Sequence, residues 1–384
     1  MNLLIANDIG NSETKMFIDG TLIKQPSVVK RVLSKPNVSE PDVHKNITNL
    51  LDELFVHVSS KAIKRDGLYF IGKRANVTSD KVENMNIKLG NKSTHDIPIL
   101  MTLSMIAARS VQLEYEKDGK LPKSISVEVD MTTAIPASEF STNQAKHLEK
   151  RFTEEPHVVI VHVGETTVTV TIEFKTVKVT QEGIPALYSL IENENGILED
   201  YNGIYEKMAQ PKDFANKKIL HVDIGDGTTE YIYTIGLNPI TDACSGAKRG
   251  VGHATEEAIQ LLKEDTGGFL EVNRQQFMNI LRDSTHNLHD LAVQHMEEAR
   301  FSQAKKILED VQEKYSDIGG NVDVIAVYGG GSIQFKEELY SDLLDFTNNV
   351  HCEVLWIPPE YAVDMNVRGL KVINEKILKK RVKG

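Results

Sequence analysis

Short apolar runs alternate with apolar repeats at helical spacing, and together they predict an α/β protein. Apolar or alternating runs predict strands over 3–6, 14–18, 21–25, 54–58, 68–72, 125–131, 158–163, 168–174, 177–180, 219–223, 231–235 and 324–328. Helical spacing predicts helices over 96–116, 253–265, 274–282, part of 284–315, and 362–380. The polar stretch 73–95 contains Asn, Ser and Gly and predicts an exposed loop.

Two of the predicted strands end in the same kind of turn. The frame Asp8-Ile9-Gly10-Asn11-Ser12-Glu13-Thr14 recurs as Asp223-Ile224-Gly225-Asp226-Gly227-Thr228-Thr229, each time between two β-rich runs. Small residues at a hairpin tip expose backbone N–H groups that can hold an anion, and the Asp at the strand end can reach a metal-bound water. One copy alone would predict an ordinary turn, whereas two copies predict a pair of phosphate-binding hairpins.

A third glycine-rich segment, Tyr328-Gly329-Gly330-Gly331-Ser332, follows a predicted strand. Consecutive glycines allow the backbone to approach a flat ligand such as a purine, close to the amides of a helix N-terminus. The chain has no GxxxxGK[ST] motif, and no GxGxxG opens a helix after the first strand. P-loop and Rossmann nucleotide sites are therefore disfavoured.

Charge and cysteine content narrow the possible partners and compartments. The 55 acidic and 44 basic side chains give a net charge of −11, which argues against direct, sequence-independent DNA binding. Two distant cysteines, Cys244 and Cys352, favour a reducing cytoplasm over a disulfide scaffold. The N-terminal residues lack a basic region and no apolar run approaches ~20 residues, so we expect a soluble cytoplasmic protein without a membrane partner.

In chain order, these motifs resemble those of the actin superfamily of ATPases, and among its members most of all the plasmid-segregating ParM-type bacterial actins. The resemblance comprises a first phosphate hairpin at 8–15, a connecting segment at 182–186, a second phosphate hairpin at 223–229, an adenosine loop at 329–332 and a second connecting helix from about 362. It covers nearly the whole chain. Asp226 departs from the pattern, because the second phosphate loop usually has Gly there, and residues 34–95 match nothing in it.

The resemblance implies an actin-like fold, with two ribonuclease H-type domains and a nucleotide cleft between them. The first domain would span 1–181, with an inserted subdomain at about 34–95 and a returning C-terminal helix at 361–384. The second would span 182–360, with an inserted helical subdomain at about 253–320.

The resemblance also implies the site residues and their ligands, ATP with Mg²⁺, while GTP stays open. Glu182 would orient and polarise the attacking water, and Asp8 and Asp223 would act with it by holding Mg²⁺ largely through water. Lys15 would neutralise β/γ-phosphate oxygens. The residues expected to contact the nucleotide are Gly10, Asn11, Ser12, Lys15, Gly225, Gly227, Thr228, Gly252, Gly330, Gly331 and Ser332.

The function implied is that of a filament-forming ATPase that segregates plasmid DNA. It would hydrolyse ATP to ADP and phosphate, form cytoskeletal filaments by self-association, and reach a centromere-like DNA site through an adaptor protein. Two alternatives stay open. One is a sugar or acid kinase of the same superfamily, although no polar substrate pocket can be identified. The other is a cell-division actin tethered by the basic tail 379–383, although its apolar face lacks Trp and Phe.

Overall fold

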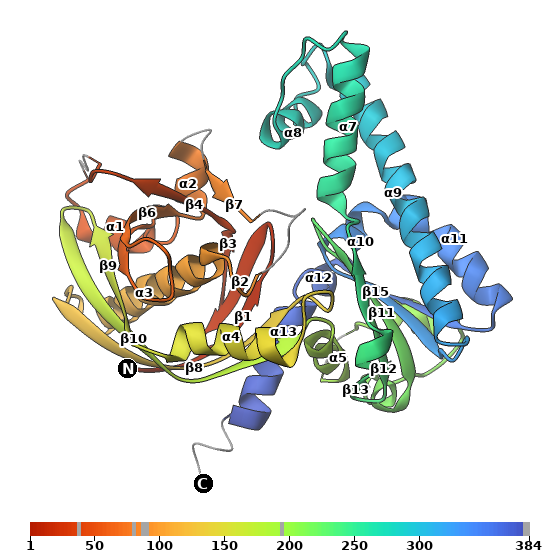
Figure 1. Cartoon of the computed structure of the whole chain (residues 1–384), viewed down its shortest axis with the longest axis horizontal. Coiled ribbons are helices and arrows are strands. Elements are labelled where there is room, and N and C mark those ends of the chain that lie inside the picture. The colour runs from red at the N-terminus through yellow and green to blue at the C-terminus, as the bar shows by residue number, and fades with distance from the viewer. Residues whose placement is uncertain (37–39, 79–81, 86–91, 193–195, 379–384) are drawn as a thin grey trace. The chain divides into compact units, whose positions relative to one another are not determined.

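The computed structural model describes the chain except for residues 37–39, 79–81, 86–91, 193–195 and 379–384 (Figure 1). The chain forms two compact units. Unit 1 contains Met1–Ser189 and Asn366–Gly384, and unit 2 contains Leu190–Met365. The basic tail and the end of the predicted last helix lie outside the described residues. No helix in the described part of the chain combines the length and the apolar character that a membrane crossing requires.

Unit 1 is built on a mixed sheet that, within the described residues, has ten strands in the order β3-β2-β1-β8-β10-β9-β5-β6-β4-β7. The strands are β1 (Asn2–Ile9), β2 (Glu13–Ile18), β3 (Thr21–Pro26), β4 (Val28–Val32), β5 (Phe55–Ser59), β6 (Gly67–Ile71), β7 (Glu83–Asn84), β8 (Ser124–Ile135), β9 (His157–Val163) and β10 (Thr166–Gln181). The two strands predicted over 168–180 form the single strand β10, whose register against β8 shifts between Phe174 and Thr176.

The helices of unit 1 pack on this sheet. They are α1 (Val43–Thr48), α2 (Lys73–Thr78), α3 (Asp96–Asp118) and α4 (Thr142–Thr153). The boundary between the units falls within two further helices, α5 (Ile184–Ile191) and α13 (Met365–Ile373). A π-helical turn (Asn374–Leu378) follows α13. α3 is buried over most of its length because apolar residues occupy nearly every side of it. It ends at Gly119, whose φ of 63° closes the helix in the left-handed region.

The prediction of an exposed loop over 73–95 is wrong for the described residues. Residues 73–78 form α2, residues 83–84 form β7, and Lys92 and Ser93 are only 5% and 2% exposed. Lys92 is buried because it pairs with a carboxylate contributed by a distant part of unit 1. Residues 79–81 and 86–91 of that prediction lie outside the described residues.

Unit 2 has a smaller sheet, in which the described strands follow the order β13-β12-β11-β15-β16, with β14 also paired to β12. The strands are β11 (Lys218–Ile224), β12 (Thr229–Ile235), β13 (Asn238–Pro239), β14 (Ser245–Ala247), β15 (Val324–Tyr328) and β16 (Glu353–Trp356). The helices are α6 (Glu199–Ile204), α7 (Val251–Asp265), α8 (Arg274–Arg282), α9 (His289–Asp317), α10 (Gly330–Gln334), α11 (Lys336–Asn349) and α12 (Pro359–Ala362), with 3₁₀ turns at Pro211–Asn216 and Thr241–Ala243. α7 packs lengthwise along α9 (Figure 1).

The two sheets share one strand arrangement. In unit 1 the order β3-β2-β1-β8-β10 contains two antiparallel pairs followed by two parallel pairs. In unit 2 the order β13-β12-β11-β15-β16 repeats that sequence of pairings. Each sheet therefore begins with a hairpin whose first strand also pairs with a parallel strand. This duplicated α/β arrangement is the ribonuclease H-type architecture expected from the sequence, and it places both predicted phosphate hairpins in equivalent positions of their sheets.

Candidate nucleotide-binding site

The first predicted phosphate hairpin joins β1 to β2 in unit 1. Asp8 and Lys15 lie directly opposite each other in the antiparallel register, and Lys15 Nζ is 4.0 Å from Asp8 Oδ2. Both side chains are largely buried, with 10% and 13% exposure. The turn itself has no room for a side chain at Gly10, because an added Cβ would lie 2.4 Å from the Glu13 carbonyl oxygen. At the tip, Asn11 is half-buried and Ser12 is exposed.

Ser27 holds this turn in place, although no sequence motif marks it. Its backbone N–H donates to the Ser12 carbonyl at 2.9 Å, and its hydroxyl donates to the Gly10 carbonyl at 2.7 Å. The same hydroxyl lies 2.9 Å from Thr14 Oγ1. Ser27 therefore satisfies two carbonyls of the turn and fixes its backbone.

Glu182 lies at the end of β10, where its N–H donates to the Ile135 carbonyl at 2.8 Å. Its Oε1 accepts a hydrogen bond from Lys92 Nζ at 2.6 Å, and both side chains are at most 10% exposed. Burial raises the pKa of the Glu182 carboxyl, and the nearby charge of Asp8 adds to this, while the Lys92 ammonium opposes it. Burial alone would lower the pKa of Lys92, but the Glu182 carboxylate outweighs it, so the Lys92 pKa lies above its usual value.

The second predicted phosphate hairpin joins β11 to β12 in unit 2. Asp223 is the penultimate residue of β11, with 9% exposure, and its cross-strand partner is the buried Glu230. The turn closes through a hydrogen bond from the Gly225 N–H to the Thr228 carbonyl at 2.9 Å. Gly225 and Thr228 are half-buried, whereas Gly227 is buried.

The N-terminus of α7 packs against this second turn. The Gly252 N–H donates to the Asp226 carbonyl at 2.8 Å, and the His253 ring lies 2.9 Å from the Gly227 carbonyl. Gly250 must also be a glycine, since an added Cβ would lie 2.5 Å from the Asp226 carbonyl oxygen. In this structure Gly252 therefore supports the hairpin, and its predicted contact with the nucleotide stays a prediction.

The unusual Asp226 is paired with a cation. Arg274, the first residue of α8, donates from Nη2 to Asp226 Oδ1 at 2.7 Å, and the two side chains are 39% and 21% exposed. The other carboxylate oxygen is buried without a hydrogen-bond partner among the described residues. The extra negative charge in this loop is thus balanced by Arg274, which the sequence reasoning missed.

The predicted adenosine loop packs against the same hairpin. Gly329 has a φ of 89°, and an added Cβ would lie 2.4 Å from Asp223 Oδ1. A Cβ on Gly331 would lie 2.5 Å from Ile224 Cγ2, and the buried Ser332 hydroxyl donates to the Gly329 carbonyl at 2.8 Å. Gly330 differs, because a Cβ there would meet no atom within 4 Å. Close packing explains Gly329 and Gly331, and of the three glycines Gly330 is the one that faces open space.

The predicted metal-side residues have the chemistry that Mg²⁺ requires. Mg²⁺ prefers carboxylate oxygens and keeps most of its waters. Asp8 in unit 1 and Asp223 in unit 2 are each the penultimate residue of a strand beside a glycine-containing turn, and both are buried. Within the described residues, no group of three or more His, Cys, Asp or Glu could hold a metal. Taken within its own unit, each carboxylate supplies the kind of oxygen that Mg²⁺ binds directly or through water.

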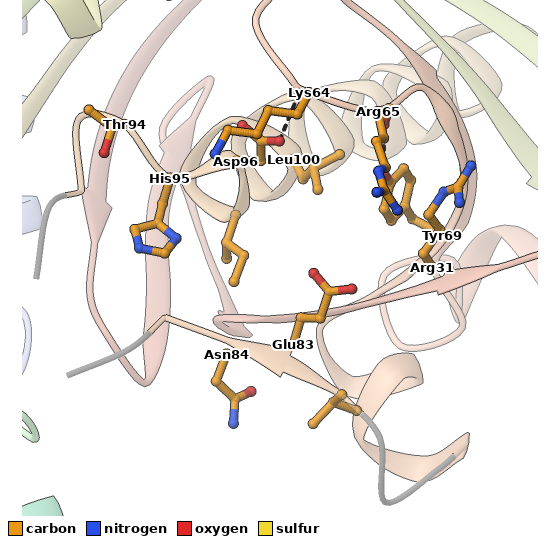
Figure 2. A pocket seen from close by; sticks show the side chains of 12 residues that line it. Arg31, Lys64, Arg65, Tyr69, Glu83, Asn84, Thr94, His95, Asp96 and Leu100 are labelled. Carbon is orange, nitrogen blue, oxygen red and sulfur yellow. Dashed lines mark hydrogen bonds between the residues drawn. The ribbon is translucent and has the colours of Figure 1, made fainter. Parts of the chain in front are cut away.

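A further pocket in unit 1 contains none of the predicted site residues. It has a volume of about 590 Å³ (Figure 2), and its lining is Arg31, Lys64, Arg65, Tyr69, Val82, Glu83, Asn84, Thr94, His95, Asp96, Ile97 and Leu100. Asp96 is occupied by structural contacts, since it accepts hydrogen bonds from the Lys64 N–H and from Arg151. The predicted phosphate hairpins lie outside this pocket and are the candidate nucleotide site.

Two family models match successive parts of the chain. The model described as "Actin like proteins N terminal domain" matches residues 6–184, which include the first hairpin and Glu182. The model described as "Archaeal actin homologue MreB-like, C-terminal" matches residues 221–341, which include the second hairpin and the glycine loop. No match was found among curated protein sequences.

Similar solved structures extend over essentially the whole chain. The actin-like protein Alp7A aligns with a TM-score of 0.72 at 16% identity, covering 100% of this chain and 99% of its own. A ParM from Clostridium botulinum, in a 15-stranded filament, aligns with a TM-score of 0.67 at 16% identity, covering 98% and 100%. Bacillus thuringiensis ParM with ATP aligns with a TM-score of 0.57 at 13% identity, covering 99% of each. With two actin-type family models along its length and an actin-like fold throughout, this chain belongs to the actin superfamily and is similar to its ParM-type members.

Proposed function

We propose that this chain is an ATP-hydrolysing, filament-forming actin that segregates plasmid DNA through an adaptor protein. The observation that carries the proposal is the pair of equivalent hairpins, each with a buried Asp at the strand end, together with Glu182 in the unit that holds Lys15. Similarity to a ParM filament and to a ParM with ATP supports both the assembly and the nucleotide.

The hairpins would bind the phosphates. In phosphoryl transfer to water the protein mainly positions the reactants and stabilises charge. The turn amides of both hairpins would donate to phosphate oxygens, and Lys15 would move from Asp8 to a β/γ-phosphate oxygen close by. Mg²⁺, when bound, neutralises phosphate charge, and Asp8 and Asp223 would hold its waters.

Glu182 would orient the attacking water. Its carboxylate lies in a largely buried setting, where burial raises its pKa and makes it a better proton acceptor than an exposed Glu. Because it acts on the water and not on the nucleotide, its loss should lower the rate and leave nucleotide affinity nearly intact.

The net charge of −11 supports an adaptor between the filament and DNA. A protein that binds DNA through phosphates needs a surplus of Lys and Arg, and this chain has a surplus of acids. The adaptor would therefore supply the basic surface that contacts a centromere-like site.

Light scattering and pelleting with Mg-ATP, Mg-GTP and no nucleotide test the assembly part of this proposal. We expect polymer to form only when nucleotide is present. A chain that stays monomeric with nucleotide across salt and crowding conditions would contradict the proposal.

Phosphate release from Glu182→Ala tests the chemistry. We expect kcat to fall about 10²- to 10⁴-fold, with retained ATP binding and longer-lived filaments. Hydrolysis at the parent rate would remove Glu182 from its assigned role.

A further inference from the structure

Lys92 is the buried cation that contacts the predicted catalytic acid. It comes from the stretch 73–95, far from Glu182 in sequence, and its ammonium donates to Glu182 Oε1 at 2.6 Å. The Lys92 backbone is fixed as well, since its N–H donates to Glu139 Oε2 at 2.7 Å. Lys92 is 5% exposed, so the pair is held inside unit 1.

The surroundings of Glu182 would by themselves disfavour its charged form. The charged groups that act on it are Lys92, Asp8 on β1 and Glu139, of which the two carboxylates repel it. Burial also opposes ionisation. Lys92 is the group among these that favours the carboxylate.

The contact also restricts the geometry of the carboxylate. A buried charged hydrogen bond fixes Oε1, so the carboxyl group cannot rotate freely. A water-orienting acid needs both properties, because a protonated or misdirected carboxyl cannot accept the water proton.

We propose that Lys92 is a positioning residue that keeps the Glu182 carboxylate ionised and oriented toward the attacking water. This inference rests on the proposed ATP hydrolysis and concerns the regulation of the same acid. It assigns a role to a segment for which the sequence offered no motif.

The test compares Lys92→Met with Lys92→Arg in the full-length chain. Lys61→Met is the matched control, because Lys61 also pairs with a glutamate in unit 1 but is exposed. Mg-ATP affinity is measured by calorimetry, kcat by phosphate release from about pH 5.5 to 8.5, and folding by thermal unfolding. We expect Lys92→Met to lower kcat about 10- to 100-fold with ATP affinity nearly unchanged.

The pH profile separates positioning from a purely structural role. Without the Lys92 ammonium the Glu182 pKa rises, so the acid limb of the kcat profile should move to higher pH in Lys92→Met. Lys92→Arg should recover most of the rate, and Lys61→Met should match the parent. If Lys92→Met unfolds, Lys92→Gln, which keeps a hydrogen-bond donor but loses the charge, takes its place, with the same expected fall in kcat and the same expected shift of the acid limb.

Three results would overturn the inference. These are a parent-like or faster kcat in Lys92→Met, an unmoved acid limb, or lost ATP binding, which would make Lys92 a phosphate ligand. The proposed function fails differently: the parent would then hydrolyse no ATP, or Glu182→Ala would keep the parent rate.

Discussion

The two hairpins have the same strand pairing but differ in the charge of the residue opposite the Asp. In unit 1 the buried Asp8 faces Lys15 across the strand pair, whereas in unit 2 the equivalent Asp223 faces the buried Glu230. Two residues before each Asp, the first strand has Ala6 and the second has His221. The turn and the Asp before it therefore recur in both units, whereas the residue opposite that Asp is a lysine in unit 1 and a glutamate in unit 2.

The turns are also supported in different ways. Ser27 of unit 1 fixes the first turn through its hydroxyl and its backbone N–H. The second turn instead rests on the start of α7 and on the Arg274–Asp226 ion pair. The two turns have the same register, with Ile9 opposite Thr14 and Ile224 opposite Thr229, but unrelated side chains support them. The hairpins should therefore respond differently to substitution.

Among the substitutions that test this comparison, Lys15→Met should have the largest effect, on Mg-ATP affinity. Loss of a charged contact to phosphate should weaken Mg-ATP binding by about 10- to 100-fold, measured by calorimetry. The matched control is Glu230→Gln, at the equivalent position of the second hairpin, which should leave affinity nearly unchanged. Equal losses in both variants would show that the two hairpins share the phosphate charge and would break the comparison.

His221 should make the second hairpin sensitive to acid. Burial lowers its pKa to about 3, below the value of about 6.5 for an unfolded chain. The folded state then binds fewer protons, so stability is full above about pH 6.5 and falls as the pH decreases. Between pH 7 and pH 5 the parent should lose about 2 kcal/mol from this group, measured by urea unfolding. His221→Gln should lose correspondingly less, and an identical pH dependence would exclude His221 as the cause.

Ser27→Ala should destabilise the first turn. Ser27 is fully buried, and its removal leaves the Gly10 carbonyl without its donor, so we expect a loss of about 1 to 2 kcal/mol in the free energy of unfolding. The control is Ser59→Ala, whose hydroxyl donates to Asp66 at an exposed site and should cost less. A Ser27→Ala protein as stable as the parent would show that the turn holds without this support.

The Arg274–Asp226 pair should give the smallest effect. Because it is partly exposed, Arg274→Met should cost at most about 1 kcal/mol, while Asp226→Gly, which restores the residue usual in this loop, should be nearly neutral. A double-mutant cycle by urea unfolding should show that Arg274→Met costs less in the Asp226→Gly background. Simple additivity would mean that the two side chains do not interact energetically.

Local signals in the sequence predicted most strands and the helices α7, α8 and α9 of unit 2, but not α6 or α11, and the order of the motifs predicted the actin-like fold through a resemblance. Asp8-Ile9-Gly10 and Asp223-Ile224-Gly225 could be recognised because turn chemistry is encoded in adjacent residues. Lys92 and Arg274 could not, since each acts through a partner distant in sequence, and nothing in a polar stretch distinguishes a buried lysine from a solvated one. The role of Ser27 could not be predicted either, because a serine after a strand is an ordinary turn residue.

Gly330 has a consequence for engineering. It is exposed, its φ lies outside the left-handed region, and an added Cβ would contact nothing, unlike Gly329 and Gly331 beside it. A bulkier residue there would leave the fold intact and extend into the space that the proposed nucleotide would occupy. Gly330→Ala and larger substitutions thus offer a steric handle, to which a trimmed ATP analogue could be matched so that it acts on the proposed nucleotide site of this chain and not on other actins.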